Sequence, residues 1–549
     1  MTVTVSYPGV YVQELPSGSH AIAGVATSIT AFIGRAPRGP IDTAITINSQ
    51  SDYERAFGGL DADSPMSFLV RDFYQNGGSQ AVVVRLFHAA TGSVAPTAIH
   101  DIGGIFKLIA ANPGSWGRGI KIEIDRDVAE QVKTLLRPAL PLNDGQVFNL
   151  KVSYGTAVEY HRNVTMVDTS RRIDKVLAAE SEIVQFPPAA LTKNISIISA
   201  LSPTFDAALA PVINAAWAAK TTVKNAASPV AVQDGTFLTK DDDFAPPEAQ
   251  HDKVGLYALE QVDLFNMLVI APTVALNAAE PRILDNDLTV LALASTYVKD
   301  RRAVLLIDPP SAWKTKKAAK DGLAVAITTI AERSYAALYF PRVMYPDPFD
   351  DDRLRPFPPS GLIAGVIART DAERGVWKAP AGLEAAIAGV FQLGVDLTDL
   401  ENGELNPMAI NCMRNKAGAG MVVWGARTLE GDDRMSSQWK YLPVRRMALF
   451  LEESLFRGSQ WVVFEPNDEP LWSQIRTNFG AFMQGLFLQG AFQGQTPEEA
   501  YFVKCDDETT TQANIDNGIV NILVGFAPLK PAEFVVISLQ QMAGQQGGG

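Results

Sequence analysis

Apolar runs alternate with amphipathic stretches over much of the chain, and this alternation predicts strands and helices in turn. Residues 28–34 and 81–87 are apolar runs typical of buried strands. Between them, residues 64–75 carry an apolar stripe at helical spacing, and Ser64-Pro65 favours a helix start. A helix between two apolar strands indicates a parallel sheet flanked by helices.

The same rhythm returns after a segment of different character. Strands are predicted at residues 264–271, 302–308 and 336–345, with helices at 288–300 and 323–332. Residues 88–250 instead carry strand-like pieces between polar loops, and a stretch rich in alanine, serine and proline. We therefore predict an α/β sheet domain formed by residues 21–87 and 251–357. It carries an inserted, mostly-β outer domain at residues 88–250.

The sequence of the last third of the chain predicts a different arrangement of helices and strands. Residues 444–457 and 471–488 form helices with broad apolar stripes, which indicates burial on more than one side. Asn467 or Asp468 can cap the second helix. Strands follow these helices, so we predict an α+β C-terminal core domain at residues 358–531.

Both ends of the chain favour β-structure. Residues 1–15 alternate apolar and polar positions around a Pro8-Gly9 break, and they form an expected N-terminal β arm within residues 1–20. Near the other end, strands are predicted at residues 501–505, 519–526 and 534–539, with a polar helical turn between the first two.

The last of these strands is apolar on both faces and opens an expected C-terminal β arm at residues 532–549. Such a strand needs neighbours at both edges. Either another copy of the protein receives the two ends, or the ends pair within their own subunit. The candidate intersubunit arm residues are Val3, Val5, Tyr7, Val10, Val12, Phe534, Val535, Val536, Ile537 and Leu539.

Composition and residue spacing argue against several classes of partner and of functional site. The net charge of -13 argues against a nucleic-acid or anionic-membrane partner. No run approaches the roughly 20 apolar residues that span a bilayer. The two cysteines, Cys412 and Cys505, have apolar neighbours and are expected to be reduced core residues. The five histidines are scattered without metal-ligand spacing, so we predict no catalytic, cofactor-binding or metal-binding residues and no cofactor.

The alternative to that conclusion is a catalytic or cation-binding site formed by acidic residues. Asp308 and Asp347 end predicted strands, where open α/β sheets often place active sites. No base, nucleophile or glycine-rich phosphate loop accompanies them, so turn capping is the preferred interpretation. The triplet Asp241-Asp242-Asp243 is predicted to be a solvated loop, because it lacks the spacing of a calcium-binding loop.

Several long strings resemble the contractile tail sheath family of phages and related contractile injection systems. They are PPSGLIAGVIARTDAERGVWKAPAG from Pro358, LNPMAINCMRNKAGAGMVVWGARTL from Leu405, RGSQWVVFEPNDEPLW from Arg457, TPEEAYFVKCDDETTTQANIDNG from Thr496 and LKPAEFVVISLQQ from Leu529. The string YPGVYVQEL near the N-terminus and the string NPGSWGRG at residues 112–119 are similar to the opening and outer-domain strings of the same family. The resemblance is dense between residues 358 and 541 and sparse between residues 88 and 250.

The resemblance implies a mechanical function. Sheath subunits of this family stack as six-fold rings around an inner tube, and they contract to drive the tube through a target envelope. Their terminal arms are expected to add strands to a neighbour's sheet. The resemblance also implies baseplate and tail-end cap proteins as partners, assembly in the bacterial cytoplasm, and a place in a phage tail or contractile injection particle. It predicts neither nucleic-acid binding nor membrane insertion.

The same resemblance indicates a surface that faces the inner tube. The polar segment of residues 506–516 is the candidate, with Asp506, Asp507 and Asp516 as its charged residues; a solvent-exposed connection is the alternative. A single chain that covers the whole sheath subunit is expected, unlike the two-protein sheaths of type VI secretion. The alternatives to a contractile sheath subunit are an enzyme that uses Asp308 or Asp347, and a non-contractile shell or tube protein.

Overall fold

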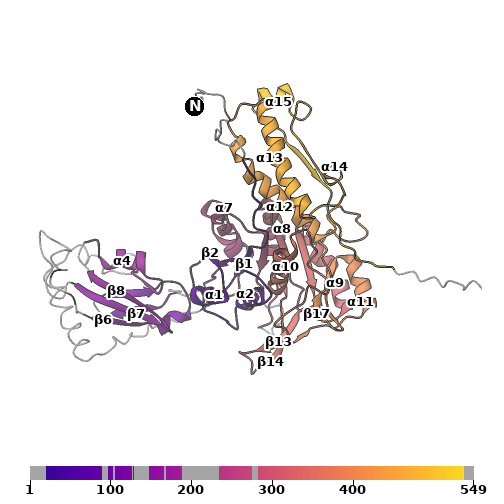
Figure 1. Cartoon of the computed structure of the whole chain (residues 1–549). Coiled ribbons are helices and arrows are strands. Elements are labelled where there is room, and N and C mark those ends of the chain that lie inside the picture. Colours follow the sequence, from indigo (N-terminus) through magenta and orange to yellow (C-terminus); the bar gives the residue numbers. More distant parts are fainter. Residues whose placement is uncertain are drawn as a thin grey trace, which may run out of the picture.

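An eight-stranded sheet forms the centre of the protein (Figure 1). The computed structural model describes residues 20–89, 97–102, 106–125, 128, 131, 147–165, 169–187, 234–274 and 282–536. The strands of the central sheet are β1 Thr30–Gly34, β2 Ala44–Ile47, β3 Ala81–Arg85, β10 Met267–Ile270, β11 Val304–Ile307, β12 Ala336–Phe340, β16 Ile410–Lys416 and β17 Gly420–Val423. Their order is β17-β16-β12-β11-β10-β1-β3-β2.

The six inner strands are parallel, and antiparallel β2 and β17 close the two edges. β1 pairs with β10, with Thr30 opposite Met267, so two segments far apart in the sequence are neighbours in the sheet. Both are buried along their whole length, as the continuous apolar runs predict.

Helices cover both faces of this sheet. Side chains alternate along β1, so that Phe32 enters the core on one face and Ala31 and Ile33 enter the core on the other. The first face packs against α1 Gln50–Phe57, α2 Pro65–Gln75 and α10 Ser360–Arg374. The second face packs against α8 Leu288–Asp300, α9 Lys316–Thr329 and α11 Asp399–Leu405.

The contact between α2 and α10 depends on glycine. A Cβ atom at Gly361 would lie 2.1 Å from the carbonyl oxygen of Leu69, and one at Gly365 would lie 2.4 Å from that of Phe73. These separations are well below van der Waals contact, so the two helix backbones can approach this closely only without side chains at both positions.

The central sheet continues past residue 358, where the sequence analysis expects the C-terminal domain to begin. β16 pairs in parallel with β12, with Leu338 opposite Ile410, and β17 follows β16 as a hairpin. Both strands extend the same buried surface, so the sheet crosses the expected boundary.

The predicted strand at residues 336–345 is two strands. β12 ends at Phe340, and Val343 begins β13, which belongs to a separate three-stranded sheet with the order β14-β13-β15. The strands of this sheet are β13 Val343–Asp347, β14 Arg353–Phe357 and β15 Gln392–Leu393.

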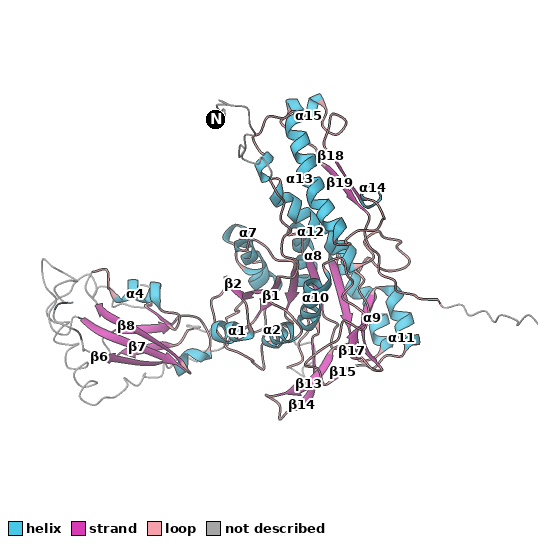
Figure 2. Cartoon of the chain, in the orientation of Figure 1, coloured by secondary structure: helices cyan, strands magenta, loops and turns pink. Residues whose placement is uncertain are grey.

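Two further small sheets lie to one side of the central body (Figure 2). One has the order β4-β5-β9 and the other β6-β7-β8, and they share one apolar core with α4. These elements are β4 Ile99–Ile102, β5 Phe106–Ala110, β6 Lys121–Asp125, β7 Val147–Tyr154, β8 Ala157–Thr165, β9 Val184–Gln185 and α4 Ile173–Glu180.

Two long helices carry the C-terminal part away from the body (Figure 1). They are α12 Leu442–Gly458 and α13 Glu469–Leu488, and Asp468 caps α13 by accepting a hydrogen bond from the Leu471 amide. Against them pack two short antiparallel strands, β18 Tyr501–Lys504 and β19 Leu523–Phe526. A buried ion pair between Arg446 of α12 and Asp371 of α10 fastens this part to the body.

Short helical segments complete the described structure. They are α7 Ala249–Asp252, α14 Pro497–Ala500, α15 Gln512–Asp516, η1 Ser115–Gly119, η3 Lys240–Phe244, η4 Gly255–Gln261, η5 Arg333–Tyr335, η6 Asn406–Met408 and η7 Gln460–Val462. Among the residues in the described ranges, no helix combines the length and apolar character that crossing a membrane requires.

Both cysteines are free and fully buried, Cys412 in the central core and Cys505 beneath α13. Burial raises the pKa of the Cys412 thiol to about 12 and that of Cys505 to about 11. The reactive thiolate is therefore scarce at neutral pH.

We expect the native chain to react very slowly with a thiol-specific dye at pH 8, and both thiols to react at once after unfolding in guanidinium chloride. Absorbance during labelling measures this. Fast labelling of one thiol in the native chain would show that its surroundings open.

Candidate functional site

The C-terminal segment leaves β19 and soon stops making backbone hydrogen bonds. Ala527 donates its amide to the Ala500 carbonyl at 2.8 Å and accepts from Gln493 at 2.9 Å. From residue 529 to 536, the described backbone makes no hydrogen bond to the backbone of another described residue. Residues 532–536 of this segment are the described part of the C-terminal arm, and they form no strand, although the sequence predicts one from residue 534.

The apolar side chains of this arm face water. Phe534, Val535 and Val536 are 73%, 80% and 87% exposed. Three consecutive exposed apolar residues of high β-propensity need a partner surface. Ile537 and Leu539, and the N-terminal candidates Val3, Val5, Tyr7, Val10 and Val12, lie outside the described residues.

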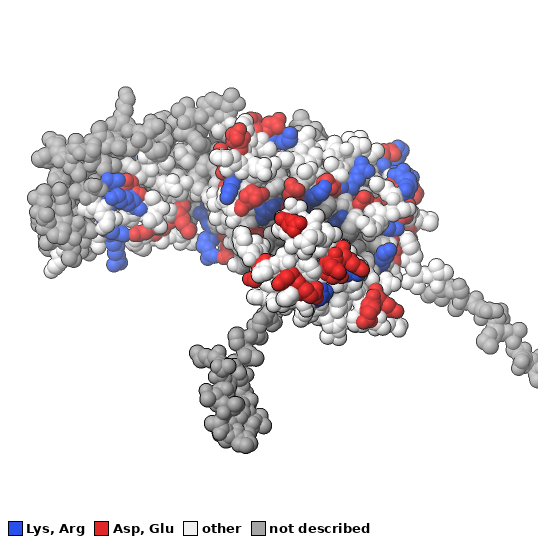
Figure 3. All heavy atoms as spheres, turned by 90° about the horizontal axis from the view of Figure 1, so that it is seen from above, with Lys and Arg blue, Asp and Glu red and all other residues white. Residues whose placement is uncertain are grey.

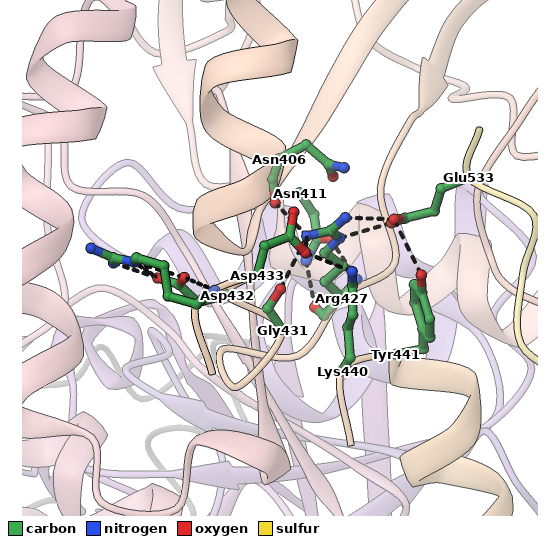
Figure 4. Close-up of polar contacts among 10 residues, drawn as sticks. Asn406, Asn411, Arg427, Gly431, Asp432, Asp433, Lys440, Tyr441 and Glu533 are labelled. Atoms are coloured by element: carbon green, nitrogen blue, oxygen red, sulfur yellow. Dashed lines mark hydrogen bonds and ion pairs between the residues drawn. The ribbon is translucent and has the colours of Figure 1, made fainter. Parts of the chain in front are cut away.

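An ion pair holds the arm just before these exposed residues (Figure 4). The Arg427 side chain is fully buried, and its guanidinium makes two parallel hydrogen bonds to the Glu533 carboxylate, with Nε 2.8 Å from Oε1 and Nη2 donating to Oε2. The Tyr441 hydroxyl donates to Oε2 of the same carboxylate at 3.3 Å. We call the pair Arg427 and Glu533 the arm clamp. A bidentate, charge-assisted pair is among the strongest polar contacts in proteins.

Arg427 has further partners that do not belong to the arm. Its Nη1 donates to the carbonyls of Asn406 at 3.0 Å and Gly431 at 3.1 Å, and to the Asp433 carboxylate at 2.9 Å. Burial by itself would lower the pKa of Arg427, but the contacts with Glu533 and Asp433 outweigh it and raise that pKa. The guanidinium therefore stays charged at every physiological pH.

The backbone of Arg427 is tied to the central sheet by one buried side chain. The Asn411 amide accepts from the Arg427 N–H at 2.7 Å and donates to the Arg427 carbonyl at 2.7 Å. Asn411 lies in β16, and it also donates to the Leu338 carbonyl of β12 at 3.1 Å. The arm clamp is thus anchored in two neighbouring strands.

No local sequence signal predicts the arm clamp. Glu533 is a single acidic residue before an apolar run, Arg427 lies 106 positions away, and each is unremarkable in its own segment. Only the fold brings them together.

β18 and β19 form a two-stranded sheet, so each has an edge without a neighbour in the described structure. Phe502 is 48% exposed and Leu523 52% exposed. Such edges can accept further strands.

The candidate tube-facing residues gather at the far end of the C-terminal part, beside α15. Asp507 and Asp516 are exposed, whereas Asp506 is half-buried and forms a turn by accepting from the Thr509 amide at 3.0 Å. Figure 3 views the molecule from above and shows acidic side chains gathered on the lower part of its central surface, with basic ones among and around them.

The strand-end carboxylates serve as structural caps. Both oxygens of Asp308 accept hydrogen bonds from Ser360, one from its amide and one from its hydroxyl, each at 2.7 Å. Asp347 accepts from the Phe349 amide at 2.9 Å and pairs with Arg355 at 2.7 Å. A cavity of about 260 Å³ near Asp308 is lined mostly by apolar side chains. The capping interpretation therefore fits better than an enzyme site.

The acidic triplet is not a fully solvated loop, so that prediction is wrong for one of its members. Asp243 is buried, accepts from the Thr239 amide at 2.7 Å and contacts His88 Nδ1 at 3.0 Å. Within the described ranges, no group of three or more His, Cys, Asp or Glu residues could hold a metal ion.

These features define a mixed α/β protein of several sheets, in which the described arm residues 532–536 pair with no described strand. Two family models match it: the phage tail sheath protein central domain over residues 256–429, and the phage tail sheath C-terminal domain over residues 435–541. Together they span just over half of the chain. The chain belongs to the contractile tail sheath family.

Curated relatives agree with this assignment. The tail sheath protein of Vibrio phage KVP40 is 27% identical over 228 residues, 41% of this chain and 32% of that protein. The tail sheath protein of Enterobacteria phage T4 is 29% identical over 175 residues, 32% of this chain and 25% of that protein. The match thus spans about a third of the length of the first relative and a quarter of the length of the second. Both relatives are structural sheath proteins.

Solved structures share the fold over nearly the whole chain. The helical sheath of the anti-feeding prophage in its contracted state has a TM-score of 0.54 and 23% identity, and it covers 98% of this chain and 100% of that one. The sheath of the extracellular contractile injection system PVC, also contracted, has a TM-score of 0.54 and 22% identity, with coverage of 98% and 99%. A sheath tail protein from Listeria innocua has a TM-score of 0.52 and 12% identity, with coverage of 93% and 97%.

The cap at Asp308 generates a pH prediction. Burial is the main cause that raises the pKa of Asp308 to about 6, and the hydrogen bonds from Ser360 oppose it only in part. The folded chain therefore binds this proton more tightly than the unfolded chain. The contribution to stability is complete below about pH 4 and is lost as the pH rises through about 6.

Between pH 5 and pH 7, the free energy of unfolding of the wild type should fall by about 1 kcal/mol relative to Asp308→Asn, which cannot ionise. Urea unfolding at both pH values measures the difference. Parallel pH dependence of the two proteins would contradict the prediction.

Proposed function

We propose that the chain is the structural subunit of a contractile sheath. In this proposal the subunits polymerise as stacked six-fold rings around an inner tube and contract to drive the tube through a target envelope. Membership of the tail sheath family and the shared fold support the general role. The observation that carries the linkage between subunits is the arm, whose residues Phe534, Val535 and Val536 are exposed and have no strand partner in the described chain.

The arms link subunits by adding strands to a neighbour's sheet. The receiving site is the β18–β19 sheet, which offers two unpaired edges and partly exposed apolar side chains such as Phe502 and Leu523. Backbone hydrogen bonds then supply affinity, and alternating side chains set the register. A contractile assembly needs such links to persist while the subunits change their packing.

The proposed division of the chain follows the central sheet. The N-terminal arm is residues 1–20, the insertion 88–250 is an outer domain, and the C-terminal arm is residues 532–549. The α/β body takes residues 21–87 and continues from 251 beyond 358, because β16 and β17 complete its sheet. The C-terminal domain then begins in the interval between the two family matches, after residue 429.

The partners in this proposal are other copies of the chain, an inner tube protein, a baseplate and a tail-end cap. Assembly takes place in the bacterial cytoplasm, and the product is a phage tail or a contractile injection particle. A non-contractile shell or tube is the second candidate, and the family membership favours the sheath over it. The capped carboxylates Asp308 and Asp347 do not favour an enzyme.

Deleting residues 532–549 should abolish polymerisation and leave a folded subunit. The deletion removes the arm, while Arg427 keeps Asp433 as a charged partner. Negative-stain microscopy and circular dichroism measure the two outcomes. Deleting only residues 542–549 is the matched control and should leave long hollow cylinders. Normal cylinders from the larger deletion would overturn the proposed linkage.

Replacing Asp506, Asp507 and Asp516 by lysine should disturb assembly templated by the inner tube, because it reverses the charge of the acidic end. Solubility should be unchanged. Asp506 also forms a turn, so the control is the double variant Asp507→Lys with Asp516→Lys, which spares that turn. Co-sedimentation with purified inner tubes measures binding. Unchanged binding of both variants would count against a tube-facing role.

A further inference from the structure

We infer that the arm clamp determines where the C-terminal arm becomes free and passes tension from the arm into the central sheet. The inference rests on the proposed function, because only a subunit linked through its arm experiences such tension. Arg427 is then a positioning residue, which acts on the neighbouring subunit through Glu533 and the arm.

Without the clamp, tension on the arm would act on β19. This strand pairs with β18 over only four residue pairs, and most of its side chains are partly exposed. Between β19 and the clamp, Ala527 and Pro528 make the described backbone contacts. A two-stranded sheet of this size is marginally stable by itself, so it is a poor anchor for a pulled chain.

With the clamp, tension follows a different route. It reaches Glu533 first and crosses the bidentate pair to Arg427. The two hydrogen bonds of Asn411 hold the Arg427 backbone, and Asn411 lies within β16. β16 is paired to β12 on one side and β17 on the other, inside the eight-stranded sheet. The arm is therefore anchored in the eight-stranded central sheet.

The unbroken run of exposed residues begins directly after the clamp, whereas exposed and half-buried residues alternate from Lys530 to Glu533. Glu533 is 15% exposed in its side chain, whereas Phe534, the next residue, is 73% exposed. The change at this single step marks the boundary between the anchored root and the part available to a partner.

The chain offers a matched pair of carboxylates for a test. Glu533 and Asp433 both contact the Arg427 guanidinium, but only Glu533 belongs to the arm. Removing either charge leaves Arg427 with the other one and with two carbonyl partners. Glu533→Gln and Asp433→Asn should therefore both fold, and they separate anchoring of the arm from charge balance at Arg427.

The experiment pulls on single full-length chains at constant force. One handle is attached at Leu400→Cys, because Leu400 is 86% exposed on the body, and the other at Gly549→Cys; the native cysteines are buried. In the wild-type background the arm should extend and then stop at the clamp. Rupture should add roughly 25 Å of extended chain for the seven residues from Ala527 to Glu533.

Glu533→Gln should shorten the lifetime of the closed clamp about tenfold or more, because it removes hydrogen bonds between charged groups. Asp433→Asn should change this lifetime by less than about threefold, because that carboxylate is partly exposed and its pair is screened by water. Equal lifetimes for the wild type and Glu533→Gln, or a larger effect of Asp433→Asn, would overturn the inference.

Assembly is a separate measurement. If the wild type forms no cylinders, the proposed sheath function fails, while the pulling experiment still decides whether the clamp anchors the arm. If the wild type does form cylinders, those of Glu533→Gln should break between rings when contraction is triggered, and those of Asp433→Asn should stay whole. Intact contracted cylinders of Glu533→Gln would show that the clamp does not carry the tension.

Discussion

The bidentate contact between Glu533 and the buried guanidinium of Arg427 fixes the position of the described part of the C-terminal arm. It holds the arm against the body at one residue and leaves the following apolar residues in water. Phe534, Val535 and Val536 follow Glu533 directly in the chain and are exposed. The exposed apolar surface of the arm therefore lies next to a strong polar contact.

This contact is strong because of what surrounds it. Arg427 is fully buried, yet all of its described guanidinium contacts are with carboxylate or carbonyl oxygens. A buried charge is tolerated only when it is paired and hydrogen-bonded to this extent. Asn411 then connects the pair to β16 and β12. A similar arrangement holds α12, where Arg446 pairs with Asp371 of α10 in a buried site. Buried arginines thus join the C-terminal part to the body at two separate places.

The proposed mechanical function gives a reason for these buried arginine contacts. A sheath that contracts must keep its links while the subunits rearrange, so links and bodies need different stabilities. In the proposed assembly, the eight-stranded sheet is the rigid element, and the short β18–β19 sheet is the receiving element. The capped carboxylate Asp308 directly follows β11 of this rigid element, whereas Asp347 lies in β13 of the separate three-stranded sheet.

Hydrophobic pattern predicted much of the fold. The run over residues 28–34, the helix at 288–300 and the long helix ending at residue 488 correspond closely to β1, α8 and α13. These predictions succeed because burial on one or both faces imposes a period of two or of 3.6 residues on the local sequence. The apolar strings of the two chain ends predict β arms, and this stays a prediction, since the described residues 532–536 form no strand.

The tertiary structure determined the features that depend on contacts between residues far apart in the sequence. β16 joins β12 across some 70 residues, and no local pattern tells which strand it will meet, so the sheet crosses the boundary predicted at residue 358. Asp243 is buried and contacts His88 and Thr239. Its two acidic neighbours in the sequence instead predicted a solvated loop. The arm clamp depends on two residues 106 positions apart. Local sequence therefore determined which segments are strands and helices, while long-range contacts determined how they pair and where residue 533 is held.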